Sequence, residues 1–324
     1  MQKVHAGADG QSGKEIGGGD SPAARKPALA GSIASREPQM YFRGIGTANP
    51  PKRYTKAECL KVFEASAWYE RLSSRSRFIM RTVLQNENGI DARRLAVDSI
   101  EEALIIDPNT LSRRFTSKAP ALAAEAGARA LKTAGIETGD IDAIIISTCT
   151  GYLCPGLSGY VTELLGLRLD VRAYDLVGQG CAAALPNFQL GAALLASGAC
   201  NHVLSICVEL SSAAIYLDND AGVLISACLF GDGAGAAVLS RQPDSSRRSV
   251  GWVDSESLID PSRRDALMFE QRDGMLRNIL TQAVPELAAE YAKRVIGTVL
   301  GRAGLLPDDM QAWILHAGGR DVGV

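Results

Sequence analysis

The sequence predicts an α/β fold in which a central sheet is covered by helices on both faces. Segments 141–148 and 202–210 are apolar runs rich in β-branched residues, as strands buried on both faces are. Helical patterns at 120–135 and 181–199 alternate with these runs along the chain. The composition of the 324 residues is that of a globular protein, with 46% hydrophobic and 22% charged residues. Strands that alternate with helices imply such a layered core.

The chain begins with a segment that has no pattern of a folded element. Residues 1–38 are rich in Gly, Ala, Ser and Lys, and they lack the apolar stretch of a signal peptide. We therefore expect a disordered tail there. The folded part is expected to begin near Met40, with a short strand and a turn. Helical patterns follow at 54–82 and, after a loop with a short helix at 88–110, at 120–135.

The next part of the chain carries the strands and helices of the expected core. Strands are predicted at 141–148, 171–180, 202–210 and 231–240, and helices between them at 156–166 and 181–199. After residue 240 the pattern starts again, with a strand at 249–256, a helix at 273–298 and a strand at 313–315. We therefore expect a first α/β half at 39–240 and a second half at 241–324 that has begun and is not completed.

Charge and cysteine content exclude several classes of function. The net charge of −2 gives no reason to expect nucleic acid or an anionic membrane as a partner. No apolar stretch is long enough for a membrane-spanning helix. Seven cysteines and three histidines show no zinc-binding spacing, so we expect no metal and no other cofactor. Most of the cysteines are expected to be small buried side chains in a reducing cytoplasm.

The segment around Cys181 carries the strongest chemical signal. Gly178-Gln179-Gly180 ends a predicted strand, and Cys181 then opens an apolar helix. A helix N-terminus favours the thiolate over the thiol, and glycines permit a sharp turn and close approach of a substrate. A cysteine nucleophile needs a cationic or hydrogen-bonding partner, and His316 stands at the end of an apolar run. The alternatives are a buried cysteine at a helix start and a core histidine.

Three motifs together make the resemblance to a known family specific. GQGC opens an apolar helix, LFGDG follows downstream, and W-x-x-H-x-G-G lies near the end of the chain. In this order the motifs resemble type III polyketide synthases of the chalcone synthase kind, over roughly residues 42–323. The resemblance implies a thiolase-like αβαβα layered sandwich of two halves, here with the second incomplete, in a cytoplasmic homodimer. It also implies loading of an acyl-CoA starter, extension by decarboxylative condensation with malonyl-CoA, and cyclisation of the product.

The resemblance also assigns roles to single residues. The catalytic cysteine and histidine of the family match Cys181 and His316, which we expect within about 3–4 Å of each other. Two gatekeeping phenylalanines match Phe230 and Phe269, for which core packing is the other interpretation. Positions that line the cavity match Cys149, Thr150, Ser211, Ala214 and Ser226.

Three further positions concern the subunit interface and coenzyme A. Cys154 matches a family residue that reaches across the dimer interface into the cavity of the other subunit. Arg71 and Arg75 fall where the family places cations for the phosphates of coenzyme A. Solvated charges on a helix are the alternative interpretation of these two arginines.

The family's third catalytic residue, an asparagine beyond the histidine, has no counterpart after His316. We therefore expect a C-terminally truncated chain with little condensing activity, because that asparagine helps to stabilise an enolate. Two other functions remain open: a ketoacyl-acyl carrier protein synthase III-like condensing enzyme, and an inactive fragment. The His-Ala-Gly-Gly context favours a type III polyketide synthase over the former.

Overall fold

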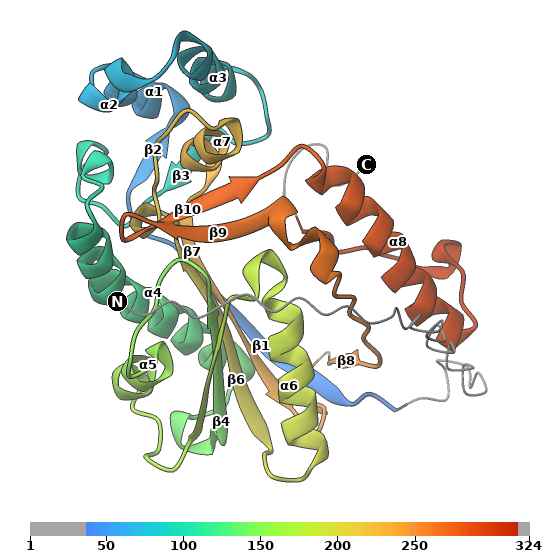
Figure 1. Ribbon diagram of the computed structural model, residues 1–324. Coiled ribbons are helices and arrows are strands. Elements are labelled where there is room, and N and C mark those ends of the chain that lie inside the picture. The colour runs from blue at the N-terminus through green and yellow to red at the C-terminus, as the bar shows by residue number, and fades with distance from the viewer. Residues whose placement is uncertain (1–36, 248, 317–324) are drawn as a thin grey trace, which may run out of the picture.

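A mixed sheet of six strands forms the centre of the molecule. The computed structural model describes residues 37–247 and 249–316 (Figure 1). The strand order is β5-β4-β6-β7-β1-β8, in which β4, β5 and β6 are parallel and the remaining neighbours are antiparallel. The strands of this sheet are β1 Met40–Ala48, β4 Ala143–Thr148, β5 Arg172–Val177, β6 His202–Leu210, β7 Asp232–Ser240 and β8 Val250–Trp252. The strands predicted before residue 240 are thus confirmed.

Helices cover both faces of this sheet, as predicted. Helices α4 (Pro108–Ala134) and α5 (Leu157–Leu165) share one apolar cluster with Ile144 of β4. Helix α6 (Ala184–Ala196) shares another cluster with Ile145, the next residue of the same strand (Figure 1). Because successive side chains of a strand point to opposite faces, this alternation buries β4 on both sides.

Helix α4 and strand β1 approach each other unusually closely. Asp107 caps the N-terminus of α4 by accepting from the Thr110 amide, and Gly135 ends it with a φ of 64°. A Cβ atom at Gly44 of β1 would lie 2.4 Å from the Ala130 carbonyl oxygen. Glycine in β1 therefore sets how tightly this long helix packs on the sheet.

The predicted helix at 54–82 is divided into three. Helices α1 (Lys56–Glu64), α2 (Ala67–Arg71) and α3 (Ser74–Gln85) replace it. The hydroxyls of Ser66 and Ser73 accept from backbone amides three residues ahead, so each serine starts a new helix. The other elements of this part are β2 Arg53–Thr55, β3 Ala92–Arg94, and the 3₁₀ turns η2 Glu101–Leu104 and η3 Thr138–Asp140.

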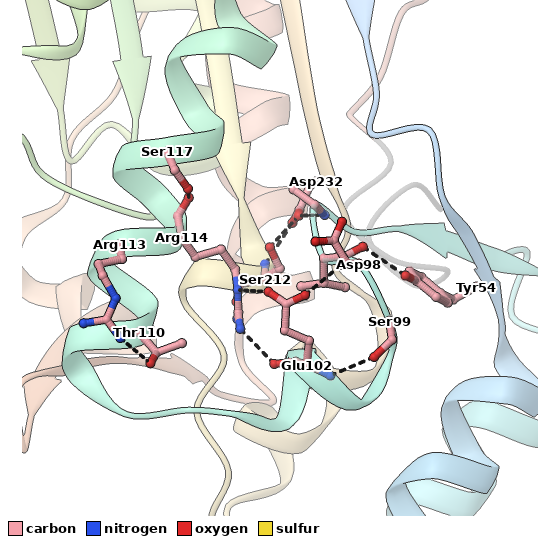
Figure 2. Close-up of polar contacts among 12 residues, drawn as sticks. Tyr54, Asp98, Ser99, Glu102, Thr110, Arg113, Arg114, Ser117, Ser212 and Asp232 are labelled. Atoms are coloured by element: carbon pink, nitrogen blue, oxygen red, sulfur yellow. Dashed lines mark hydrogen bonds and ion pairs between the residues drawn. The ribbon is translucent and has the colours of Figure 1, made fainter.

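A buried polar network ties this N-terminal part to the sheet (Figure 2). Asp232, the first residue of β7, accepts from the Ser212 amide at 2.8 Å, from the Ser212 hydroxyl at 2.6 Å and from the Ala96 amide at 2.6 Å. Arg114 of α4 donates to the carbonyl oxygens of Ser212 and Glu102. Burial raises the pKa of Asp232, while its hydrogen bonds oppose that shift.

The chain after residue 240 differs from the expectation in two elements. A hairpin of β9 (Leu267–Arg272) and β10 (Met275–Leu280) occupies the start of the predicted helix at 273–298, and α8 spans Val284–Ala303. Asp273 and Gly274 have φ values of 52° and 75°, which is the turn that an Asp-Gly pair favours in a two-residue hairpin. The predicted helix at 273–298 is therefore confirmed only from residue 284 onward, because the Asp-Gly turn ahead of it joins two paired strands.

The strand predicted at 313–315 is wrong. These residues have no regular structure, and the Ile314 side chain is fully exposed. A strand is stable only where a neighbour satisfies its backbone hydrogen bonds, and no described strand pairs with this segment. The strand expected at 249–256 is present as β8, which joins the sheet of the first half by pairing with β1. The division at residue 240 remains a prediction.

The remaining described elements are α7 Ala221–Leu229 and the 3₁₀ turns η4 Gly180–Ala182, η5 Ser211–Ala213, η6 Pro261–Ala266 and η7 Pro307–Asp309. Among residues 37–247 and 249–316, no helix has the length and apolar character needed to cross a membrane. Within the same ranges, no group of three or more His, Cys, Asp or Glu side chains could hold a metal ion. Except for residues 37 and 38, the predicted tail lies outside the described residues.

Candidate active site

Two cysteines follow the same end of neighbouring parallel strands. Thr148 of β4 pairs with Val177 of β5, and these are the last residues of the two strands. Cys149 follows β4 directly, while Cys181 follows β5 after a turn in which Gly178 and Gly180 have positive φ. In open α/β sheets, ligands bind beyond the carboxyl ends of the parallel strands. The fold therefore places Cys181 at the edge where a substrate site is expected.

Cys181 lies one turn earlier relative to the helix than the sequence indicated. It belongs to the 3₁₀ turn η4, and α6 begins only at Ala184. The helix N-terminus, which was expected to favour the thiolate of Cys181, is outweighed by effects that raise the pKa of this thiol. The Cys181 residue is exposed, yet partial desolvation of its thiol by the surrounding protein raises its pKa, the charge of Glu209 raises it further, and only a backbone amide lowers it. A raised pKa favours the neutral thiol, so a nucleophilic role for Cys181 would require a base that accepts its proton.

Glu209 organises the polar groups at this edge. Its carboxylate accepts from the Cys149 amide at 2.9 Å and from the Thr150 hydroxyl at 2.7 Å, and the Thr148 hydroxyl lies 3.3 Å away. Burial raises the pKa of Glu209 despite these bonds. Burial, followed by the charge of Glu209, also raises the pKa of Cys149. Glu209 therefore links both cysteines electrostatically.

Glu209 was missed by the sequence analysis, although a signal for it existed. It is the only acidic residue in the apolar strand at 202–210. A carboxylate is seldom buried without a specific set of donors, so one in such a strand indicates a functional or structural polar cluster.

Six of the predicted substrate-binding residues line one pocket. They are Thr150, Ser211, Ala214, Ser226, Phe230 and Phe269. The pocket also includes residues that the sequence did not single out: Arg93, Leu95, Ile215, Tyr216, Val223, Ala227 and Asn278. Its volume of about 30 Å³ has room for only a few waters. Thr150 connects this pocket to Glu209.

The Asp232 network explains how part of this pocket is held in place. Asp232 lies two residues after Phe230 in the LFGDG motif, and it binds both the amide and the hydroxyl of Ser212. Ser212 is the centre of η5, which carries Ser211 to the pocket. A motif that the resemblance linked to a gatekeeping phenylalanine therefore also anchors a neighbouring part of the pocket lining.

The other predicted site residues lie outside this pocket's lining. The Cys149 side chain is partly buried and that of Cys154 is exposed. Arg71, at the end of α2, lies over the Trp68 ring at 5.2 Å, and Arg75 is exposed on α3. His316 is exposed and makes no hydrogen bond to any other described residue. The pairing of His316 with Cys181 and the roles of these residues remain predictions.

Comparison with known proteins gives a consistent result. A profile of the family described as "FAE1/Type III polyketide synthase-like protein" matches residues 46–252. The 1,3,6,8-tetrahydroxynaphthalene synthase of Streptomyces peucetius subsp. caesius is 28% identical over 281 residues, which cover 86% of this chain and 73% of that protein. The 3,5-dihydroxyphenylacetyl-CoA synthase of Streptomyces toyocaensis is 27% identical over 294 residues, covering 88% of this chain and 73% of that protein.

Solved structures show the same fold. The crystal structure of PKS-I from the brown alga Ectocarpus siliculosus superposes with a TM-score of 0.78 at 25% identity, covering 87% of this chain and 78% of that one. The C-terminal type III polyketide synthase domain of Steely1 from Dictyostelium gives a TM-score of 0.75 at 22% identity, with coverages of 87% and 80%. The expected thiolase-like α/β fold is thereby confirmed.

Proposed function

The chain belongs to the FAE1/type III polyketide synthase-like family, and on that premise we propose that Cys181 accepts an acyl group from a coenzyme A thioester. The acyl group is then extended with malonyl-CoA, which loses CO₂, and the resulting chain is cyclised. The two Streptomyces relatives are named as synthases of aromatic polyketide products, which supports this reaction class.

One observation carries the proposal. Six residues chosen from sequence motifs that are dispersed over more than a hundred positions line a single pocket. Thr150 joins that pocket to Glu209, whose charge acts on Cys181. A nucleophile linked to a lined cavity through Glu209 and Thr150 suits acyl transfer followed by chain growth.

The raised pKa of Cys181 shapes the first step. The thiol loses its proton to a base as its sulfur attacks the thioester carbonyl, and the bond from that carbon to the coenzyme A sulfur breaks. Coenzyme A leaves as a thiolate that takes up a proton. We assign the base to His316, which the family motif matches to the catalytic histidine.

The same proposal covers the subunit arrangement and the residues that bind coenzyme A. We propose a cytoplasmic homodimer without metal, in which Cys154 contributes to the cavity of the other subunit. The exposed side chain of Cys154 suits a residue that contacts another chain. Arg71 and Arg75 would bind the phosphates of coenzyme A, for which adjacent exposed helices provide cations.

The test is acylation measured by intact-protein mass spectrometry. After incubation with hexanoyl-CoA, the wild-type chain should gain one acyl group, whereas Cys181→Ala should gain none. Cys200→Ala is the matched control, because it removes a thiol just before the start of β6, at the other end of the parallel strands from Cys181, and should still be acylated. Acylation of Cys181→Ala at the wild-type rate would refute the assignment. Radiolabelled malonyl-CoA then measures extension separately, and an acyl carrier protein thioester as donor tests the ketoacyl synthase alternative.

A further inference from the structure

The pocket has a polar wall that the aromatic residues do not explain. Asn278 of β10 lines the pocket with only 7% of its surface exposed, and its side-chain amide nitrogen donates to the Ser226 hydroxyl at 2.6 Å. The Ser226 hydroxyl in turn donates to the Gly222 carbonyl at 2.9 Å. Ser226 has only one proton to give, so it must accept from Asn278, and this fixes which end of the amide faces it.

The side-chain amide of Asn278 therefore keeps an acceptor and a donor that no described residue uses. The carbonyl oxygen of its amide has no donor among the described residues, and the nitrogen uses one of its two protons. The Asn278 Oδ1 atom is not among the fully buried atoms that lack a partner, so it is open to the pocket, where a ligand can offer it a hydrogen bond. A ketone can accept the second N–H, while an enol or hydroxyl can donate to the free oxygen.

The position of Asn278 is set by its neighbours in the hairpin, where it lies beside the aromatic Phe269. Asn278 pairs directly with Phe269 across the hairpin, and both line the pocket. Its neighbour Arg277 is bound to Asp218 at 2.7 Å and to Glu270 at 3.1 Å, which fixes the hairpin against the loop before α7. A hydrogen-bonding group held in this way can discriminate between ligands by geometry.

A cation lies in the same wall. Arg93 is 5% exposed, and its guanidinium donates to the carbonyl oxygens of Ala227 and Phe230 at the end of α7. Its Nε atom is buried and has no hydrogen-bond partner among the described residues. The positive charge beside the pocket adds to the preference for oxygen atoms over methylene groups.

We propose that Asn278, oriented by Ser226, selects acyl chains that carry a carbonyl, enol or hydroxyl oxygen over aliphatic chains of the same length. The inference rests on the proposed function, and it names the class of chain that the site holds. A growing poly-β-keto chain has such oxygens on alternate carbons, whereas a fatty acyl chain has none.

The test uses matched pairs of coenzyme A esters that differ only in one ketone. Acetoacetyl-CoA competes with butyryl-CoA, and 5-oxohexanoyl-CoA competes with hexanoyl-CoA, while mass spectrometry measures the ratio of the two acyl groups on Cys181. The wild-type chain should favour the keto member of at least one pair. Asn278→Leu, which nearly conserves volume, should reduce that preference roughly tenfold, the effect of one lost hydrogen bond. Ser226→Ala should reduce it less.

Two controls separate the possible outcomes. Asn109→Leu changes the same residue type on the exposed first turn of α4 and should leave the ratio unchanged. If Asn278→Leu unfolds at a clearly lower temperature than the wild-type chain, Asn278→Ala is measured in its place. An unchanged ratio in both pairs, or a wild-type preference for the aliphatic chain, would overturn the inference.

Binding separates this inference from the proposed function. The affinities of the same esters for Cys181→Ala, measured by titration calorimetry, need no acyl transfer. If the wild-type chain is not acylated but Cys181→Ala still prefers the keto ester, and adding Asn278→Leu removes that preference, the selection stands and the transfer fails. Equal affinities for the keto and aliphatic esters would refute the selection directly.

Discussion

The chain up to residue 240 and the described chain after it are stabilised by different interactions. In the first region, three apolar clusters fill both faces of the sheet and the space beneath the N-terminal helices. In the second region, the only buried apolar residues among those described are Leu300 and Ala303. Its buried polar residues are Arg277 and Asn278, and both reach back to the first region.

This contrast shows that polar contacts can position a region that has little core of its own. Arg277 fixes the hairpin to Asp218, and Arg302 of α8 binds Asp254 at 3.0 Å and Glu256. Ion pairs of this kind give orientation more than stability, because desolvation offsets much of their attraction. The pocket wall that Asn278 provides therefore depends on geometry set by charges, whereas the wall from α7 depends on apolar packing.

The largest expected difference concerns apolar truncations in the two regions. Leu204→Ala in β6 removes a side chain with no exposed surface and should lower the free energy of unfolding by about 2–5 kcal/mol. Ile314→Ala removes an equally apolar side chain that is fully exposed, and its effect should stay below about 0.5 kcal/mol. Urea titration of both variants measures the two losses. A loss at Ile314 as large as that at Leu204 would show that 313–315 is packed in solution.

The same contrast explains how far the sequence could predict the fold. The buried strands and their helices before residue 240 were predictable because apolar periodicity there coincides with real burial. The run at 313–315 has the same composition, but a strand also needs a neighbour, which composition does not encode. The hairpin at 267–280 was encoded locally by Asp273-Gly274, and only the stronger helical pattern behind it concealed the signal.

The candidate site was predictable to the extent that motifs mark it. Phe230 and Ser226 came from the resemblance and do line the pocket. The resemblance did not point to Glu209 or Asn278. Their importance arises from which strands are neighbours and which side chains lie beside each other across a hairpin. Similarly, the pKa of Cys181 depends on desolvation and on Glu209, neither of which a local motif reveals.

The next prediction concerns the opposite pH dependence of carboxylates in the two regions. Burial raises the folded-state pKa of Glu209, so its contribution to stability is fully present below the ordinary carboxyl pKa near 4 and is lost as pH rises through the folded value. Hydrogen bonding from Arg302 lowers the pKa of Glu256, so its contribution is present above that ordinary value and is lost as pH falls.

Unfolding at a series of pH values from about 3 to 8 measures both effects. Glu209→Gln should relieve the loss of stability that the wild-type chain shows on raising the pH, by about 1.4 kcal/mol for each unit of pKa shift. Glu256→Gln should instead lower stability above about pH 4, and by less, because its side chain is about one-third exposed. If both substitutions changed the pH dependence of stability in the same direction, the opposite pKa shifts of Glu209 and Glu256 would be contradicted.

The smallest expected effect is on the reactivity of Cys181 itself. Because the charge of Glu209 raises the Cys181 pKa, Glu209→Gln should increase the thiolate fraction, and iodoacetamide should label Cys181 a few-fold faster at about pH 8. The gain should shrink as the pH falls, because Glu209 becomes protonated in the wild-type chain as well. The exposed Cys154 is an internal control and should be labelled at the same rate in both proteins. Glu256→Gln, in the other region, should leave Cys181 unchanged. An equal acceleration by both substitutions would mean that the effect comes from general loosening of the chain and not from the charge of Glu209.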